Sequence, residues 1–138
     1  MNANQQQDKL FHIGIAVARF NADITDALLT GALVRLSELG FREEYIHTLH
    51  VPGAVELPLA AQHFFQHQTV SAVICLGAVI KGETDHYDYV CQQVSYGCQR
   101  VMLDHKKPVV FGILTTTTVE QAQARTGGAK GHKGRESV

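Results

Sequence analysis

The chain has 138 residues, a length that fits a single domain spanning residues 1–138. Hydrophobic residues make up 45% of it, which is enough for one core and unlike the composition of a disordered protein. The formal net charge is -1, with acidic and basic residues interspersed, and this argues against an extended nucleic-acid-binding surface.

Neither a membrane span nor a secretion signal is apparent in the sequence. No run of roughly 18 apolar residues is present, so we expect no membrane association. Residues 1–9 are polar and glutamine-rich, unlike a signal peptide, and predict a flexible N-terminal arm on a cytoplasmic protein. Cys75, Cys91 and Cys98 are odd in number and lack CxxC spacing, which favours small buried side chains in a reducing compartment.

Four apolar runs alternate with helical patterns along the chain. The runs that predict strands are residues 12–18, 46–51, 72–80 and 109–114. The run 46–51 is the more polar one and indicates a strand near an edge of the sheet. The run 72–80 is apolar on both faces, which is typical of a central strand in a parallel sheet.

Between and after these runs, apolar residues recur with the helical period. The predicted helices are residues 24–39, 56–67, 87–101 and 118–125. Asp23 is the expected cap of the first helix, Gly40 is its expected stop, and Pro58 is tolerated in the first turn of the second. The order βαβαβαβα predicts an α/β fold with a four-stranded parallel sheet between two layers of helices.

Polar, aromatic and glycine residues gather where the predicted strands end. The segments concerned are residues 19–21, 51–56, 77–87 and 115–118. Open parallel sheets bind ligands beyond the carboxyl ends of their strands, so we expect all four segments on one rim. Together they supply an aromatic face, a carboxylate, a glycine turn leading into a helix, a histidine and several hydroxyls. This convergence predicts a binding site.

Two of the rim residues have alternative interpretations. Phe20 is either a core residue or, between the polar Arg19 and Asn21, a rim residue that stacks on a planar ligand. Glu56 is either a site carboxylate or a solvated residue favoured by the helix dipole in a first turn.

The turn over residues 82–85 leads into a helix whose first N–H groups are free to bind an anion. Glu83 and Asp85 would repel a phosphate unless they turn outward, so an Arg or Lys from elsewhere would then be needed. The alternative is a plain turn with an N-cap. His86 lies just inside this helix, beside the expected anion site, and is a candidate for proton transfer.

Other motifs are weaker. His63 and His67 are four residues apart on a predicted helix, a spacing that suits a metal pair, but no third ligand is evident and the two fit an exposed histidine face. The glycine-rich turns match neither the P-loop nor the GxGxxG fingerprint. The tail over residues 127–134 is rich in glycine and lysine, and we expect a mobile loop or a segment ordered by a ligand or partner.

Six short stretches stand in a fixed order over almost the whole chain. They are ARFN (18–21), VPGAVELP (51–58), GAVIKGETDHYDYV (77–90), FGILTT (111–116), ARTG (124–127) and GHKG (131–134). In these stretches the sequence resembles the lumazine synthase family of riboflavin biosynthesis. The resemblance implies a flavodoxin-like three-layer α/β/α fold and assembly into homopentamers, or into icosahedral capsids built from pentamers, with riboflavin synthase as a candidate partner.

The resemblance also implies a reaction. The family condenses 5-amino-6-(D-ribitylamino)uracil with 3,4-dihydroxy-2-butanone 4-phosphate to give 6,7-dimethyl-8-ribityllumazine, inorganic phosphate and water. No metal and no organic cofactor are implied. Two alternatives remain open on the residues alone: a non-catalytic flavodoxin-like carrier of a flavin or lumazine, and a structural shell protein.

Roles for single residues follow from the resemblance, position by position. Pyrimidine and ribityl binding is implied for Phe20, Asn21, Ala54, Val55, Glu56, Ala78, Val79, Ile80 and Phe111. Phosphate binding is implied for Glu83, Thr84 and Arg125, with Lys133 as a further candidate, and proton transfer for His86. Of these residues, Phe111, Arg125 and Lys133 would reach the site of a neighbouring subunit, where Arg125 would supply the missing cation.

The sequence departs from the family pattern in two places. Val55 stands where the family often has an aromatic residue, which matters little if the backbone makes the contacts. The family has a further helix after the KG turn, and the expectation is that this C-terminal helix is absent after residue 138.

Overall fold

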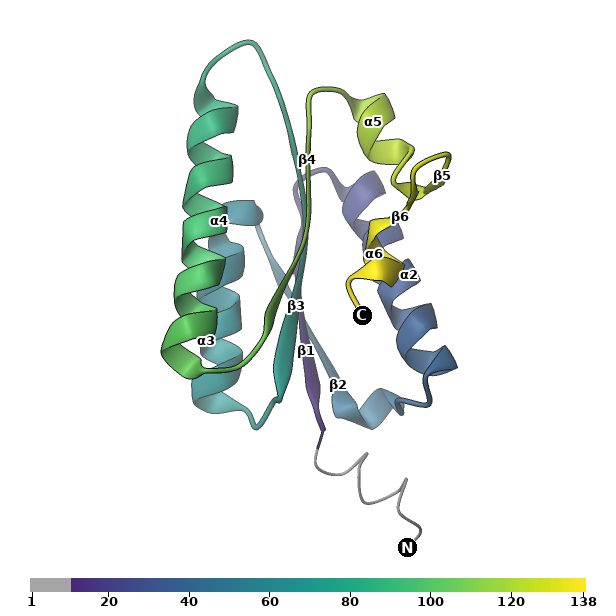
Figure 1. The fold of residues 1–138 in the computed structure, drawn as a ribbon, viewed down its shortest axis with the longest axis vertical. Coiled ribbons are helices and arrows are strands. Elements are labelled where there is room, and N and C mark those ends of the chain that lie inside the picture. The colour runs from purple at the N-terminus through teal and green to yellow at the C-terminus, as the bar shows by residue number, and fades with distance from the viewer. Residues whose placement is uncertain (1–10) are drawn as a thin grey trace, which may run out of the picture.

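The computed structural model describes residues 11–138, so the arm expected over residues 1–9 lies outside the described part. Its centre is a parallel sheet of four strands in the order β2-β1-β3-β4 (Figure 1). The strands are β1 (Ile13–Ala18), β2 (Ile46–Val51), β3 (Ala72–Ile80) and β4 (Val109–Thr116). The predicted sheet is confirmed, with the polar strand β2 at one edge and β3 inside.

Helices cover both faces of this sheet and complete three layers (Figure 1). One face carries α3 (Leu57–His67) and α4 (His86–His105), and the other carries α2 (Ala22–Glu38), α5 (Val119–Gln123) and α6 (Lys133–Glu136). Short 3₁₀ helices, Glu43–Tyr45 and Ala54–Glu56, precede β2 and α3. The α/β class and the flavodoxin-like layering are therefore confirmed.

Two apolar clusters fill the space between the layers, because successive side chains of β1 and β3 point to opposite faces of the sheet. On the α3 and α4 side the cluster includes Ala16, Leu57, Phe64, Cys75 and Val94, and on the α2 side it includes Ile15, Leu28, Leu36, Leu76 and Leu114. All six residues of β1 are buried. Strands covered on both faces leave no exposed side chains along their length, so polar groups collect at the strand ends.

Helix boundaries differ from the predictions at three points. The first helix begins behind Asn21, which adopts a left-handed conformation (φ 62°, ψ 52°), while Asp23 lies in the first turn and does not cap it. Asn tolerates this conformation better than most residues. The second helix begins at Leu57, after the 3₁₀ turn. The last predicted helix ends at Gln123, so Arg125 lies beyond it.

The tail after α5 is folded, so of the two alternatives for residues 127–134 the mobile loop is wrong. It forms an antiparallel hairpin, β5 (Thr126–Gly128) with β6 (Gly131–His132), followed by α6. This four-residue helix begins with the Lys133-Gly134 pair itself, so it is not the further helix that the resemblance implies after the KG turn. The tail is folded because it packs closely on α2.

Close backbone approach seats the tail on α2. Gly134 faces the backbone carbonyl of Leu28 so closely that a Cβ atom there would overlap it. Gly31, on α2, faces the imidazole of His132 in the same way. The His132 ring also accepts a hydrogen bond at Nδ1 from the Arg135 amide (3.4 Å), which caps α6. Two glycines, one on each segment, therefore allow α2 and the tail to touch.

A charged pair completes this contact. Arg135 donates two hydrogen bonds to the Glu38 carboxylate, with Nη2 to Oε2 at 2.8 Å and Nη1 to Oε1 at 3.1 Å. Hydrogen bonds from Arg135 and then from Arg35 lower the pKa of the Glu38 carboxyl. Since the pair is exposed, it orients the tail more than it stabilises the fold.

Two further observations concern the whole described chain. No helix within residues 11–138 is both long and apolar enough to cross a membrane. All three cysteines are free thiols; Cys75 and Cys98 are buried as predicted, and Cys91 is half-buried.

Gly31→Ala is expected to loosen the tail, because the added methyl group would overlap the His132 ring and force it off α2. Overpacking of this kind typically costs about 1–3 kcal/mol. Amide hydrogen exchange over residues 126–136 should speed up, and the free energy of unfolding should fall. As a control, Gly31→Ala combined with His132→Ala should destabilise by less than the sum of the two single changes. Unchanged exchange in Gly31→Ala would contradict the described packing.

Candidate active site

A cavity of about 440 Å³ opens beyond the carboxyl ends of β1 and β3. It is lined by Phe20, Asn21, Gly53, Ala54, Val55, Ala78, Val79, Ile80, Gly82, Thr84, His86, Tyr87 and Val90. Three of the four predicted rim segments, residues 19–21, 51–56 and 77–87, thus contribute to one cavity. The fourth, residues 115–118, does not line it. We call this space the rim cavity.

The loop after β1 presents an exposed aromatic ring to the rim cavity. Phe20 is 71% exposed, which excludes the interpretation as a core residue. Its amide donates a hydrogen bond to the Pro52 carbonyl (3.0 Å), and the Asn21 side-chain amide donates one to the Ala78 carbonyl (2.9 Å). These bonds tie the loop to two neighbouring segments, so the ring is held at the mouth of the cavity.

The turn before α3 contributes backbone and small side chains. Ala54 and Val55 line the rim cavity, whereas Glu56 does not. The Glu56 carboxylate accepts a hydrogen bond at Oε2 from the Gly53 amide (3.1 Å), as in the capping of a helix start. Glu56 therefore fixes the shape of this turn, with its carboxylate next to the cavity.

The start of α4 forms another wall of the rim cavity. Gly82, Thr84 and His86 line it, and Glu83 lies outside the lining. Asp85 precedes the helix without a side-chain cap, while the His86 amide donates to the Thr84 hydroxyl at 3.4 Å. The first amides of a 20-residue helix carry partial positive charge and favour an anion in front of them. His86 is exposed at this end of the helix.

Tyr87, Val90, Gly53 and Gly82 line the rim cavity but were not among the predicted site residues. The sequence pattern had placed Tyr87 and Val90 on the buried stripe of the helix. Burial and the neighbouring Cys91 raise the pKa of the Tyr87 phenol, although a hydrogen bond with Thr115 acts in the opposite direction. The phenol is therefore a hydrogen-bonding group in this wall and stays protonated at neutral pH.

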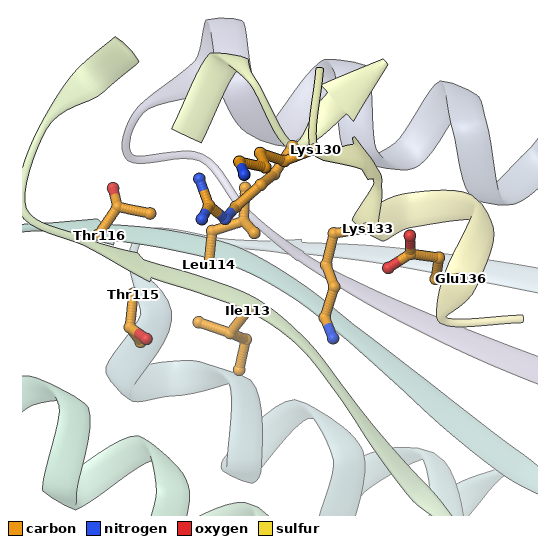
Figure 2. A pocket seen from close by; sticks show the side chains of 8 residues that line it. Ile113, Leu114, Thr115, Thr116, Lys130, Lys133 and Glu136 are labelled. Atoms are coloured by element: carbon orange, nitrogen blue, oxygen red, sulfur yellow. The ribbon is translucent and has the colours of Figure 1, made fainter. Parts of the chain in front are cut away.

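A second cavity of about 300 Å³ lies against the edge strand β4, and we call it the cation cavity. Figure 2 shows its side chains between β4 and the folded tail. It is lined by Ile113, Leu114, Thr115, Thr116, Arg125, Lys130, Lys133 and Glu136. No residue lines both cavities. Arg125 and Lys133 thus lie together in one chain, but apart from Phe20 and His86.

Phe111 and the histidine pair on α3, both considered in the sequence analysis, line neither of the two cavities. Phe111 is half-buried on β4, packs against the cluster on the α3 and α4 side, and lines neither cavity. The rings of His63 and His67 lie 4.7 Å apart on the exposed face of α3. Within residues 11–138, no group of three or more His, Cys, Asp or Glu side chains is placed to hold a metal ion.

The fold and the two cavities define a class of protein before any relative is considered. Parallel three-layer α/β domains bind small molecules beyond their strand ends, and here an apolar cavity with an exposed aromatic ring adjoins a helix start suited to an anion. The chain is a small-molecule-binding α/β domain of flavodoxin-like architecture.

Comparison with known proteins narrows this class to one family. A family model described as 6,7-dimethyl-8-ribityllumazine synthase matches residues 10–138. Two relatives of that name, from Coxiella burnetii strains CbuG_Q212 and RSA 493 / Nine Mile phase I, are each 56% identical over 124 residues, which is 90% of this chain and 82% of theirs. A third, from strain Dugway 5J108-111, is 55% identical. The chain belongs to the 6,7-dimethyl-8-ribityllumazine synthase family, a family of enzymes.

Proposed function

We propose that the chain catalyses the condensation of 5-amino-6-(D-ribitylamino)uracil with 3,4-dihydroxy-2-butanone 4-phosphate, in riboflavin biosynthesis. Two observations support this reaction: the chain belongs to the family, and it has the rim cavity. The rim cavity is the main structural observation. The arylamine adds to the ketone carbonyl to form an imine, phosphate is eliminated, and the ring closes. This chemistry requires neither a metal nor an organic cofactor.

The rim cavity suits the pyrimidine substrate. We assign stacking on the ring to Phe20, whose exposed face is held at the mouth of the cavity. The remaining assignments to the pyrimidine and ribityl chain are Asn21, Ala54, Val55, Glu56, Ala78, Val79 and Ile80. Backbone groups of a strand end and a turn can contact a flat polar ring without bulky side chains, so Val55 serves as well as an aromatic residue here.

The start of α4 suits the phosphate of the second substrate. We assign phosphate binding to the helix-start amides around Glu83 and Thr84, because unpaired N–H groups at a helix start favour an anion. Glu83 and Asp85 both lie outside the lining of the rim cavity, in keeping with the expectation that their carboxylates turn outward. The required cation is Arg125, supported by Lys133.

Arg125 and Lys133 lie in the cation cavity, so we propose that they serve the rim cavity of a neighbouring copy. Heterologous contacts of this kind form a ring when the rotation between copies closes, and a homopentamer, alone or built into an icosahedral shell, is the assembly we propose. Phe111 would reach the same neighbouring site. An exposed apolar stripe on α4 supports such contacts, since Tyr89, Tyr96 and Leu103 recur every two turns and are each at least 63% exposed.

Two further parts of the proposal rest on the family alone. Riboflavin synthase, which would consume the product, is the proposed protein partner. The cytoplasm is the proposed location.

Catalysis by this site is proposed to depend mainly on positioning, because both organic reactants are reactive once held together. His86 would move protons beside the leaving phosphate, a role that typically contributes about 10²–10⁴-fold. The alternative of a passive carrier needs Phe20 and the rim cavity but no cation and no histidine.

The wild-type protein, mixed with both substrates, should produce the lumazine, detected by its fluorescence, whereas a carrier or shell protein would not.

His86→Ala should lower kcat by about 10²-fold and leave a measurable rate, because the substrates are still positioned correctly. Binding of the pyrimidine, followed by its absorbance, should be unchanged. Complete loss of turnover with intact binding of both substrates would contradict a site that works by positioning.

Arg125→Ala should raise KM for the ketone phosphate by about tenfold or more and change KM for the pyrimidine far less. Losing a charge-assisted hydrogen bond costs about 1.5–3 kcal/mol, and about 1.4 kcal/mol corresponds to a factor of ten. Steady-state kinetics with each substrate varied in turn provide the measurement. Equal losses for the two substrates would refute the assignment of Arg125 to the phosphate.

A further inference from the structure

The hairpin that follows α5 turns back over the end of that helix. Its two strands are joined by Ala129 and Lys130 alone. Gly127, within β5, and Gly131, directly after the connection, have positive φ angles of 102° and 81°. Glycine adopts such angles without strain, whereas other residues do so at a cost. The turn is therefore tight, and it brings Lys130 back to the end of α5.

Two backbone hydrogen bonds fix the hairpin against the end of α5. The Lys130 amide donates to the Ala124 carbonyl (2.9 Å), and the Lys133 amide donates to the next carbonyl, that of Arg125 (2.8 Å). Lys130, Lys133 and Arg125 are thus brought together by main-chain bonds that do not depend on their side chains. All three side chains line the cation cavity, where Lys133 extends toward β4 and Lys130 lies beside the hairpin (Figure 2).

The three cations of this cavity lack carboxylate partners. Within residues 11–138, Arg125, Lys130 and Lys133 form no ion pair, although Glu136 also lines the cavity. The Arg125 guanidinium donates to the Gln121 carbonyl (2.8 Å), an uncharged acceptor. Three cations share the cavity with a single carboxylate, that of Glu136, so positive charge is in excess, and an anion of more than one charge would relieve the repulsion between the cations.

We propose that Lys130 is a third cationic contact for the phosphate of the ketone substrate and sets the preference of the site for the phosphate dianion. The inference rests on the proposed function, and it adds a residue that neither the sequence motifs nor the family resemblance assigned. A phosphate monoester carries a charge of about −1.5 to −2 at pH 7 and has three strong acceptor oxygens, so it can accept hydrogen bonds from a third cation as well as from two others and a helix start. Lys, as a mobile point charge, suits this role at the tip of a hairpin.

The test replaces Lys130 with Met, which keeps the length of the side chain and removes its charge. Lys130→Met should raise KM for the ketone phosphate about tenfold and raise the inhibition constant of inorganic phosphate by a similar factor. KM for the pyrimidine and kcat should stay within about twofold. Lys130→Arg, which keeps the charge, should restore most of the loss.

Lys106→Met is the matched control, since Lys106 is exposed at the far end of α4 and its loss changes the net charge equally. It should leave all these constants unchanged. Equal effects of the two variants, or equal losses for both substrates in Lys130→Met, would overturn the role of Lys130.

Equilibrium dialysis of inorganic phosphate against the wild-type protein and Lys130→Met separates this inference from the proposed reaction. Weaker phosphate binding in the variant supports a phosphate contact by Lys130, even if the wild type forms no lumazine. That second result would contradict only the proposed function. Equal phosphate binding overturns the role of Lys130 even if the wild type is fully active.

Discussion

The constraint on which the molecule depends is the burial of β1 and β3 on both faces of an all-parallel sheet. Strands of this kind cannot carry polar groups along their length, so chemistry is confined to their ends. Because the strands run the same way, the segments after β1, β2 and β3 meet at one rim. Phe20, the Gly53 turn and the start of α4 meet there for this reason, although they are far apart in sequence.

Because β4 lies at the edge of the sheet, the candidate site residues fall into two separate cavities. The rim cavity lies toward β1, β3 and α4, while the segment after β4 returns to α2 and carries the cations away from it. A tail seated on α2 through Gly31, His132 and Gly134 holds those cations in a fixed place. The described residues thus form two cavities with no lining residue in common, and the proposed sharing of a site between copies rests on this separation.

Much of this could be predicted because it depends on local pattern. The strands along the chain, the edge position of β2 and the layers follow from apolar runs and helical periods. Of the two alternatives for Phe20, the rim position that its polar neighbours favoured fits its exposure. The folded tail was missed, because its order comes from contacts between residues about a hundred positions apart, such as Arg135 with Glu38, and from glycines that read as flexible. Tyr87 and Lys130 were missed because a helical period and a glycine-rich stretch say nothing about which side chain faces a cavity.

The most direct test of a composite site is a mixture of two damaged proteins. Phe20→Ala should weaken binding of the pyrimidine in the rim cavity, and Arg125→Ala should weaken binding of the ketone phosphate by the cation cavity. Each protein alone should therefore have low activity when both substrates are kept well below their KM values. If neighbouring copies share a site, subunits unfolded and refolded together in equal amounts should regain roughly a quarter of wild-type activity, because about one interface in four joins two intact halves. Activity no higher than the mean of the two separate proteins would contradict the account.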